Sequence, residues 1–122
     1  FAHAIEMATD KLLKKDFLRH GEAVGLGMLC EIMMQKGENT DETYKLTEKL
    51  LSKYGLPTNL NVPSYLKKRI HSHVYNGVFL DKKTLNKHPR YISLKKVGQP
   101  KILEINDFGK LNDVIYKITK EN

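Results

Sequence analysis

The chain of 122 residues contains one cysteine and no long run of apolar residues. Its lone Cys30 excludes an internal disulfide, which is typical of proteins from a reducing compartment. No apolar stretch approaches the ~20 residues of a membrane span, and the first residues show neither the basic start nor the apolar core of a secretory leader. We therefore expect a cytoplasmic protein without membrane contact, in which Cys30 is a small buried apolar residue.

The chain also lacks the features that mark nucleic-acid binding, although its formal net charge is +7. Clustered Lys and Arg side chains attract phosphate backbones, but here they are scattered and no aromatic stacking motif accompanies them. We expect most of them to form solvated faces, and we predict no nucleic-acid partner. The short basic runs are Lys14-Lys15, Lys67–Arg69, Lys82-Lys83 and Lys95-Lys96.

Apolar residues recur at helical spacing through most of the chain. The second such stretch is apolar almost throughout, so we expect that helix to be buried on most sides. The third carries one apolar stripe from Tyr44 to Tyr54. The predicted helices run from the first residues to about Lys14, from Gly21 to about Lys36 with Gly37 as its stop, from Thr40 or Asp41 to Gly55 and Pro57, from Pro63-Ser64 to about Asn76-Gly77, over Val78–Lys87, and from Asn106 or Asp107 through Ile118.

A strand pair interrupts the helices near the end of the chain. Arg90–Val97 is rich in β-branched and aromatic residues, which predicts a strand after Pro89. The turn residues Gly98–Pro100 then lead to an antiparallel partner at Lys101–Ile105. The length suits one domain over residues 1–122. The predicted class is therefore mainly α with one small antiparallel β-hairpin.

The segment His20–Met28, with the sequence HGEAVGLGM, combines a histidine with three glycines in a predicted helix. Glycine inside a helix costs about 1 kcal/mol relative to alanine, so these glycines indicate the close approach of another backbone or of a ligand. A neutral imidazole at the helix start can bind a metal or a substrate oxygen. Together with His3 in the preceding helix, the segment is interpreted as one wall of an active site.

Spacing alone does not make either histidine functional. A zinc site normally needs three or four donors, and the chain has neither a helical histidine four residues after His20 nor a cysteine pair. On this ground alone, spacing favours ordinary histidines at helix starts for both His20 and His3 over functional ones. We interpret the remaining histidines, His71, His73 and His88, as non-functional.

Three blocks of the sequence resemble one known family. His3–Glu6 followed by His20–Met28 looks like the metal-binding region of 3-dehydroquinate synthase and its sugar-phosphate cyclase relatives. Asp81–Lys83 and the later strand pair resemble that family's subsequent segments. The resemblance covers only the C-terminal helical part of the family. It therefore implies the C-terminal fragment of a two-domain enzyme, without the N-terminal NAD-binding domain.

The resemblance also implies roles for particular residues. In the family a divalent metal, zinc or cobalt, is held by a glutamate, by a histidine four residues before the position of His3, and by the histidine matching His20; only His20 lies in this sequence. His3 corresponds to an active-site residue that contacts the substrate and is not a metal ligand. An active-site lysine corresponds to Lys82 or Lys83, and a fixed cation there suits a substrate with phosphate and carboxylate groups.

The sequence departs from the family pattern at three places. The segment between His3 and His20 is longer than usual, Ala2 stands where glycine is common, and Asn86–Pro89 replaces a glycine turn. A helix from His3 runs about 12 Å away, so the chain must double back before His20 if both histidines share a pocket. Two carboxylates near the histidines are less specific. Glu22 is expected to support the helix dipole, and Glu6 to orient a neighbour or face solvent.

For the whole enzyme the resemblance implies a lyase of the shikimate pathway that acts as a homodimer. It would convert a phosphorylated seven-carbon keto sugar acid into a carbocycle through transient oxidation by bound NAD, phosphate elimination, re-reduction and aldol closure. The alternatives are another cyclase such as 2-deoxy-scyllo-inosose synthase, a metal-dependent glycerol or alcohol dehydrogenase, and a stand-alone helical binding module. The block Glu22–Val24 after His20-Gly21 argues against the dehydrogenase.

Overall fold

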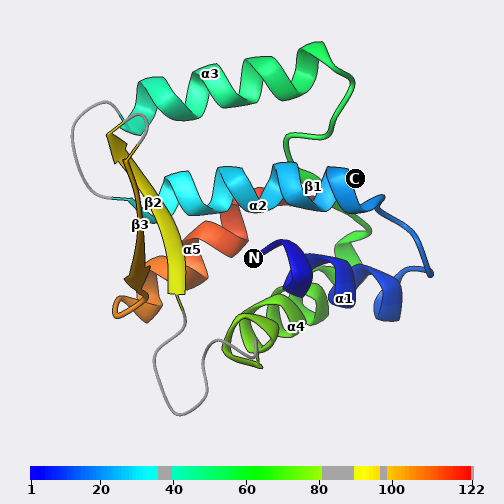
Figure 1. Ribbon diagram of the computed structural model, residues 1–122. Helices are drawn as coiled ribbons and strands as arrows, with labels where there is room; N and C mark the ends of the chain where they lie inside the picture. Colours follow the sequence, from blue (N-terminus) through cyan, green and yellow to red (C-terminus); the bar gives the residue numbers. More distant parts are fainter. Residues whose placement is uncertain (36–39, 81–89, 97–98, 122) are drawn as a thin grey trace.

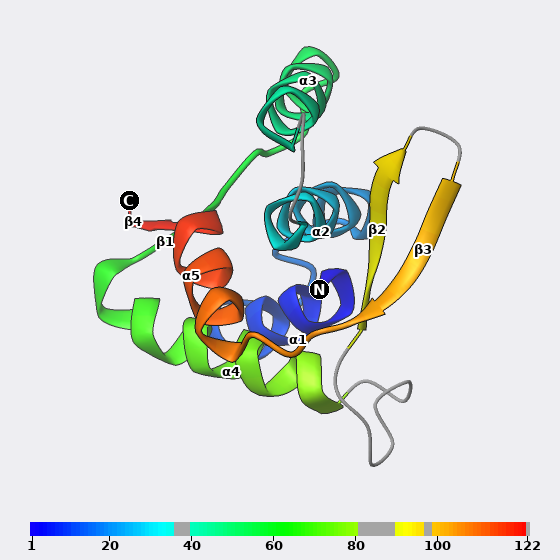
Figure 2. The ribbon, with the colours of Figure 1, turned by 90° about the vertical axis from the view of Figure 1, so that its left-hand side faces the viewer.

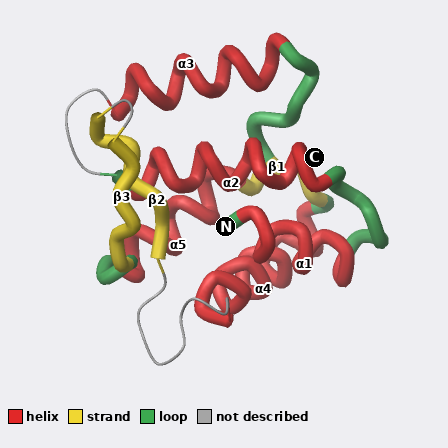
Figure 3. Tube along the Cα trace, viewed as in Figure 1, coloured by secondary structure: helices red, strands yellow, loops and turns green. Residues whose placement is uncertain are grey.

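The computed structural model describes residues 1–35, 40–80, 90–96 and 99–121. These residues form five α-helices and two short strand pairs, so the predicted mainly α class is confirmed (Figures 1 and 3). No helix in these ranges is long and apolar enough to cross a bilayer. The helices are α1 (Ala2–Leu12), α2 (His20–Met34), α3 (Thr40–Lys53), α4 (Lys67–Leu80, after the 3-10 turn Ser64–Leu66) and α5 (Phe108–Ile118).

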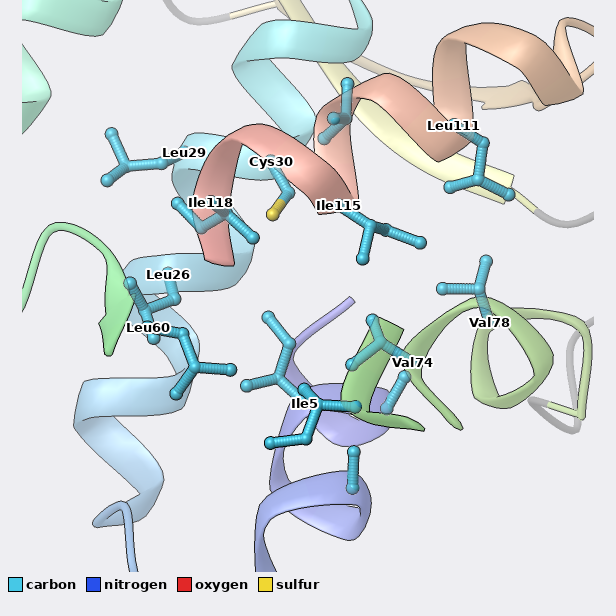
Figure 4. Packing of buried hydrophobic residues seen from close by; sticks show 14 of the residues in the cluster. Ile5, Leu26, Leu29, Cys30, Leu60, Val74, Val78, Leu111, Ile115 and Ile118 are labelled. Atoms are coloured by element: carbon cyan, nitrogen blue, oxygen red, sulfur yellow. The ribbon is translucent and has the colours of Figure 1, made fainter. Parts of the chain in front are cut away.

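One apolar core joins four of the helices. Ile5 of α1, Leu29 of α2, Val74 of α4 and Ile115 of α5 meet there and are almost completely buried (Figure 4). Cys30 is fully buried in the same cluster, as predicted. Helix α3 stands apart from this group and packs on α2 (Figure 2). The core therefore fixes α1 and α2, the two helices that carry the histidines, relative to each other.

Two glycines let α1 fit closely between its neighbours. A Cβ at Gly27 of α2 would lie 2.9 Å from the backbone nitrogen of Ala2, and one at Gly77 of α4 would lie 2.9 Å from Cβ of Ala4. Neither position has room for a larger residue. The close approach predicted for the glycine-rich segment is thus confirmed at Gly27, whereas nothing lies within 4 Å of a Cβ at Gly21.

Gly27→Ala is expected to destabilise the fold by about 1–3 kcal/mol, because the added methyl meets backbone that cannot move independently. The clash outweighs the gain in helix propensity, which is about 1 kcal/mol. Thermal unfolding of the purified chain measures the effect. Gly21→Ala in the same helix is the matched control and should leave the melting temperature unchanged or raise it. A Gly27→Ala variant as stable as the parent would contradict the packing described here.

Most helix boundaries agree with the sequence, with one clear exception. Helix α4 was expected to close near Asn76-Gly77 but continues to Leu80, because Gly77 is a packing contact and not a helix end. Helix α2 begins one residue early, at His20, and ends at Met34. Gly37 and residues 81–87 of the predicted helix Val78–Lys87 lie outside the described residues.

The stripe predicted on α3 is only partly a packing face. Leu51 is buried against Gly25 of α2, but Leu50 and Tyr54 are 48% and 73% exposed. Among the described helices α3 packs mainly on α2, so a single line of side chains is enough to hold it. As predicted, α3 ends before Gly55, which has a φ of +74°.

The strand pairs lie on opposite sides of the helices (Figures 1 and 2). The predicted hairpin is confirmed, with β2 (Arg90–Lys96) antiparallel to β3 (Gln99–Glu104). The second pair was not predicted and consists of β1 (Leu60–Val62) parallel to β4 (Thr119–Glu121). Helix α5 begins as expected, because the carboxylate of Asp107 accepts a hydrogen bond from the backbone N–H of Lys110.

Candidate metal centre

A histidine and a carboxylate from different helices meet at the start of α2. Nδ1 of His20 lies 2.6 Å from Oε1 of Glu6 on α1. An ionised carboxylate only accepts hydrogen bonds, so Nδ1 of His20 carries the proton and donates it. In the neutral ring the lone pair is then on Nε2, and the side chain of His20 is 78% exposed while that of Glu6 is 25% exposed. A carboxylate bonded to one ring nitrogen, with the other nitrogen open, is typical of metal-binding histidines.

Local structure holds this pair in place from both sides. The carboxylate of Glu22 accepts a hydrogen bond from the backbone N–H of Arg19 at 2.7 Å, which caps α2 immediately before His20. The packing of Gly27 on Ala2 sets the distance between α1 and α2. Glu6 was expected to orient a neighbour or to face solvent, and it contacts His20; Glu22 supports the helix start as expected.

The chain doubles back between α1 and α2, which is the condition for His3 and His20 to share a pocket. The backbone N–H of Asp16 donates to the side chain of Asp10 at 3.0 Å, which ties the connection to the end of α1. Asp16 has a φ of 58°, a left-handed conformation that aspartate tolerates better than most residues. The longer spacing between His3 and His20 is therefore accommodated by a folded connection.

Of the other predicted site residues, the structure describes His3 alone. His3 is exposed in the first turn of α1, and it lies on the same side of that helix as Glu6, three residues later. It therefore lies on the side of α1 that reaches His20. Lys82 and Lys83, together with His88, lie outside the described residues.

His20 offers one metal donor, and nothing else in the described ranges completes a site. No group of three or more His, Cys, Asp or Glu side chains converges within the described part of the chain. Burial raises the pKa of the Cys30 thiol to about 12, so Cys30 stays protonated at neutral pH and is a poor ligand and a poor nucleophile. His71 packs between α4 and α5, where its Nε2 lies 3.3 Å from the backbone oxygen of Asn112.

Sequence analysis missed an exposed apolar strip beside the histidines. Val24 and Met28 are 37% and 45% exposed and follow His20 at intervals of four residues, while Met7 follows His3 on α1 at the same interval and is 50% exposed. Helix α2 is buried on most sides, as predicted, and this strip lies on its exposed side. The four-residue spacing was the available signal, but the continuous apolar composition of α2 hid it. An apolar strip next to an open histidine suits a surface that another part of a larger protein covers.

Comparison with known proteins identifies the family of the chain. The model of the family described as 3-dehydroquinate synthase C-terminal matches residues 1–84, and the chain belongs to this family. The relatives include proteins named 3-dehydroquinate synthase from Campylobacter hominis, 36% identical over 84% of the chain, and from Clostridium perfringens, 33% identical over 81%. Another, from Campylobacter fetus, is 32% identical over 94%.

The chain covers only part of these relatives. It spans 27% of the Campylobacter hominis and Clostridium perfringens proteins and 31% of the Campylobacter fetus protein. No solved structure gives a significant match. The matched region contains His3, Glu6 and His20 and extends to the segment with Lys82 and Lys83.

Proposed function

We propose that the chain is the C-terminal, metal-side domain of a 3-dehydroquinate synthase, which acts together with an N-terminal NAD-binding domain. The observation that carries the proposal is His20, whose Nδ1 is fixed by Glu6 and whose Nε2 is left open, in a chain of this family. The whole protein would be a cytoplasmic homodimer and a lyase of the shikimate pathway. Its substrate would be a phosphorylated seven-carbon keto sugar acid, which loses phosphate and closes to a carbocycle.

In this proposal His20 holds a divalent metal, zinc or cobalt, through Nε2, and the remaining ligands come from outside the chain. A bound metal of this kind acts as a Lewis acid toward substrate oxygens. Glu6 keeps the proton on Nδ1 of His20 and fixes the direction of the ring. His3, exposed one turn before Glu6, contacts the substrate by a hydrogen bond or a proton transfer.

The experiment that tests the proposal is a phosphate-release assay. The whole protein, supplied with NAD and zinc or cobalt, should release phosphate from the keto sugar-acid phosphate and lose this activity when a chelator is added. The isolated 122-residue chain should show neither turnover nor NAD binding, because NAD would bind to the N-terminal domain and the described residues supply a single candidate metal donor, His20. Turnover by the isolated chain that a chelator abolishes would contradict the division of the site between two parts.

One of the two substitutions Lys82→Met and Lys83→Met is expected to lower kcat/KM of the whole enzyme about ten- to a hundredfold, through a higher KM or a lower kcat. The reason is that a charge-assisted hydrogen bond to a phosphate or carboxylate is worth about 1.5–3 kcal/mol in a partly desolvated site. The other substitution should be nearly silent and serves as its control. Steady-state kinetics at fixed ionic strength measure the effect. If kcat/KM of both variants stays within about twofold of the parent, this segment is a solvated surface.

A further inference from the structure

A cleft lies at the C-terminal end of α2, the end that is remote from His20. It has a volume of about 740 Å³ and is lined by residues of α3 and α5 and by Thr58 and Asn59, just before β1. Figure 2 shows how these elements are arranged. Small-molecule sites typically measure about 300–1,000 Å³. Helix α2 has 15 residues, so its two ends are about 20 Å apart. The cleft is therefore separate from the candidate metal centre.

Charges of both signs line the cleft. Asp41 and Glu48 of α3 line one side, seven residues and therefore two helical turns apart. Lys110 and Lys117 of α5, with the same spacing, line the other side. Lys120 of β4 adds a third cation, and Asp113 of α5 adds a third carboxylate.

Gln35, the residue after α2, contributes an almost completely buried side chain to the lining of the cleft. Gln35 is 7% exposed, and its amide nitrogen has no hydrogen-bond partner among the described residues. That nitrogen has less than 1 Å² of accessible surface, so it does not open into the cleft. The backbone oxygen of Gln35 accepts a hydrogen bond from Nζ of Lys110 at 3.3 Å, which ties the end of α2 to α5. Met33 and Val114 provide apolar surface beside them.

The arrangement of charges excludes simple ions as the best ligand. A polyanion would be attracted by the lysines but repelled by three carboxylates, and a cation would meet the opposite conflict. A molecule that carries both charges can pair with groups of both signs. Tyr44 of α3 also lines the cleft, and burial raises the pKa of its phenol, so it remains a neutral hydrogen-bonding group.

We propose that this cleft binds a small zwitterion of the α-amino acid type with an apolar side chain. The carboxylate lies against Lys117 of α5 and Lys120 of β4, and the ammonium group lies toward Asp41 and Glu48. The apolar side chain packs on Met33 and Val114. The site is independent of the metal centre and of the reaction proposed above.

Calorimetric titration of the whole protein with L-valine, L-leucine and L-methionine tests the proposal. At least one of them should bind with one site per chain and a Kd below about 1 mM. Its N-acetyl and amide derivatives, which each lack one charge, should bind at least about tenfold more weakly. No binding of any of the three up to about 10 mM, or equal binding of the blocked derivatives, would overturn the proposal.

Two variants locate the site. Lys117→Met and Glu48→Gln should each weaken binding of the zwitterion about ten- to a hundredfold. Lys49→Met and Glu42→Gln, exposed residues of α3 that do not line the cleft, are the matched controls and should bind as the parent does. Binding that both cleft variants leave unchanged would overturn the assignment. Metal content and phosphate release should be unaltered in all four variants, so failure of this proposal is distinguishable from failure of the proposed function.

Discussion

Replacing His20 by alanine in the whole protein is expected to remove the bound metal and the activity together. His20 is proposed as a direct ligand, so its loss should weaken metal binding by more than the roughly 10–100-fold that removal of a supporting hydrogen-bond partner costs. The side chain is 78% exposed, so the substitution leaves no cavity and the fold should persist. Metal content by mass spectrometry, measured beside the rate of phosphate release, gives the result.

His3→Ala is the matched comparison for this experiment. It removes an exposed histidine from the neighbouring helix, and it should leave the metal bound while lowering turnover. The difference follows because one residue is proposed as a ligand and the other as a substrate contact. Equal loss of metal in both variants, or retention of metal in both, would contradict these roles.

The second large effect is expected at Glu6. Glu6→Ala should weaken metal binding about 10–100-fold, because His20 loses the partner that fixes its tautomer and ring direction. Glu6→Gln should fall between this variant and the parent, since an amide oxygen still accepts the hydrogen bond but carries no charge. Competition with a chelator of known affinity measures the metal Kd of each variant.

Glu22→Gln is the control for the Glu6 variants. Glu22 is also a carboxylate near the start of α2, but it accepts a hydrogen bond from the backbone of Arg19 and not from His20. Its amide replacement can keep that bond, so the metal Kd should stay within about threefold of the parent. An equal loss of affinity in Glu22→Gln and Glu6→Ala would mean that negative charge near the helix start matters, and not the bond from Nδ1 of His20.

The helices could be predicted from the sequence because their signals are local. The apolar spacing of α1, the cap at Asp107 and the glycine after α3 each act within a few residues. The pair β1 and β4 could not be predicted in this way. Each strand has three residues, and the partners are separated by more than fifty positions, so no periodic pattern marks them. The role of Gly77 was also non-local, since it depends on the position of Ala4 in another helix.

The candidate site could be predicted only where the family resemblance identified a residue. His20 lacks any donor at metal-binding spacing in the sequence, and its partner Glu6 stands fourteen residues earlier on another helix. That contact depends on the crossing of α1 and α2, which the packing at Gly27 fixes. The exposed strip of Met7, Val24 and Met28 could not be recognised either, because composition alone does not show which side of a helix is covered.

The central claim is that Nε2 of His20 binds the metal while Nδ1 donates to Glu6. Nitrogen-15 NMR of the histidine side chains in the whole protein, loaded with cadmium-113, tests this most directly. The account predicts a one-bond coupling between cadmium and Nε2 of His20, with the proton on Nδ1. Coupling to Nδ1 of His20, or a His20 ring that shows no coupling while the protein holds its metal, would contradict it.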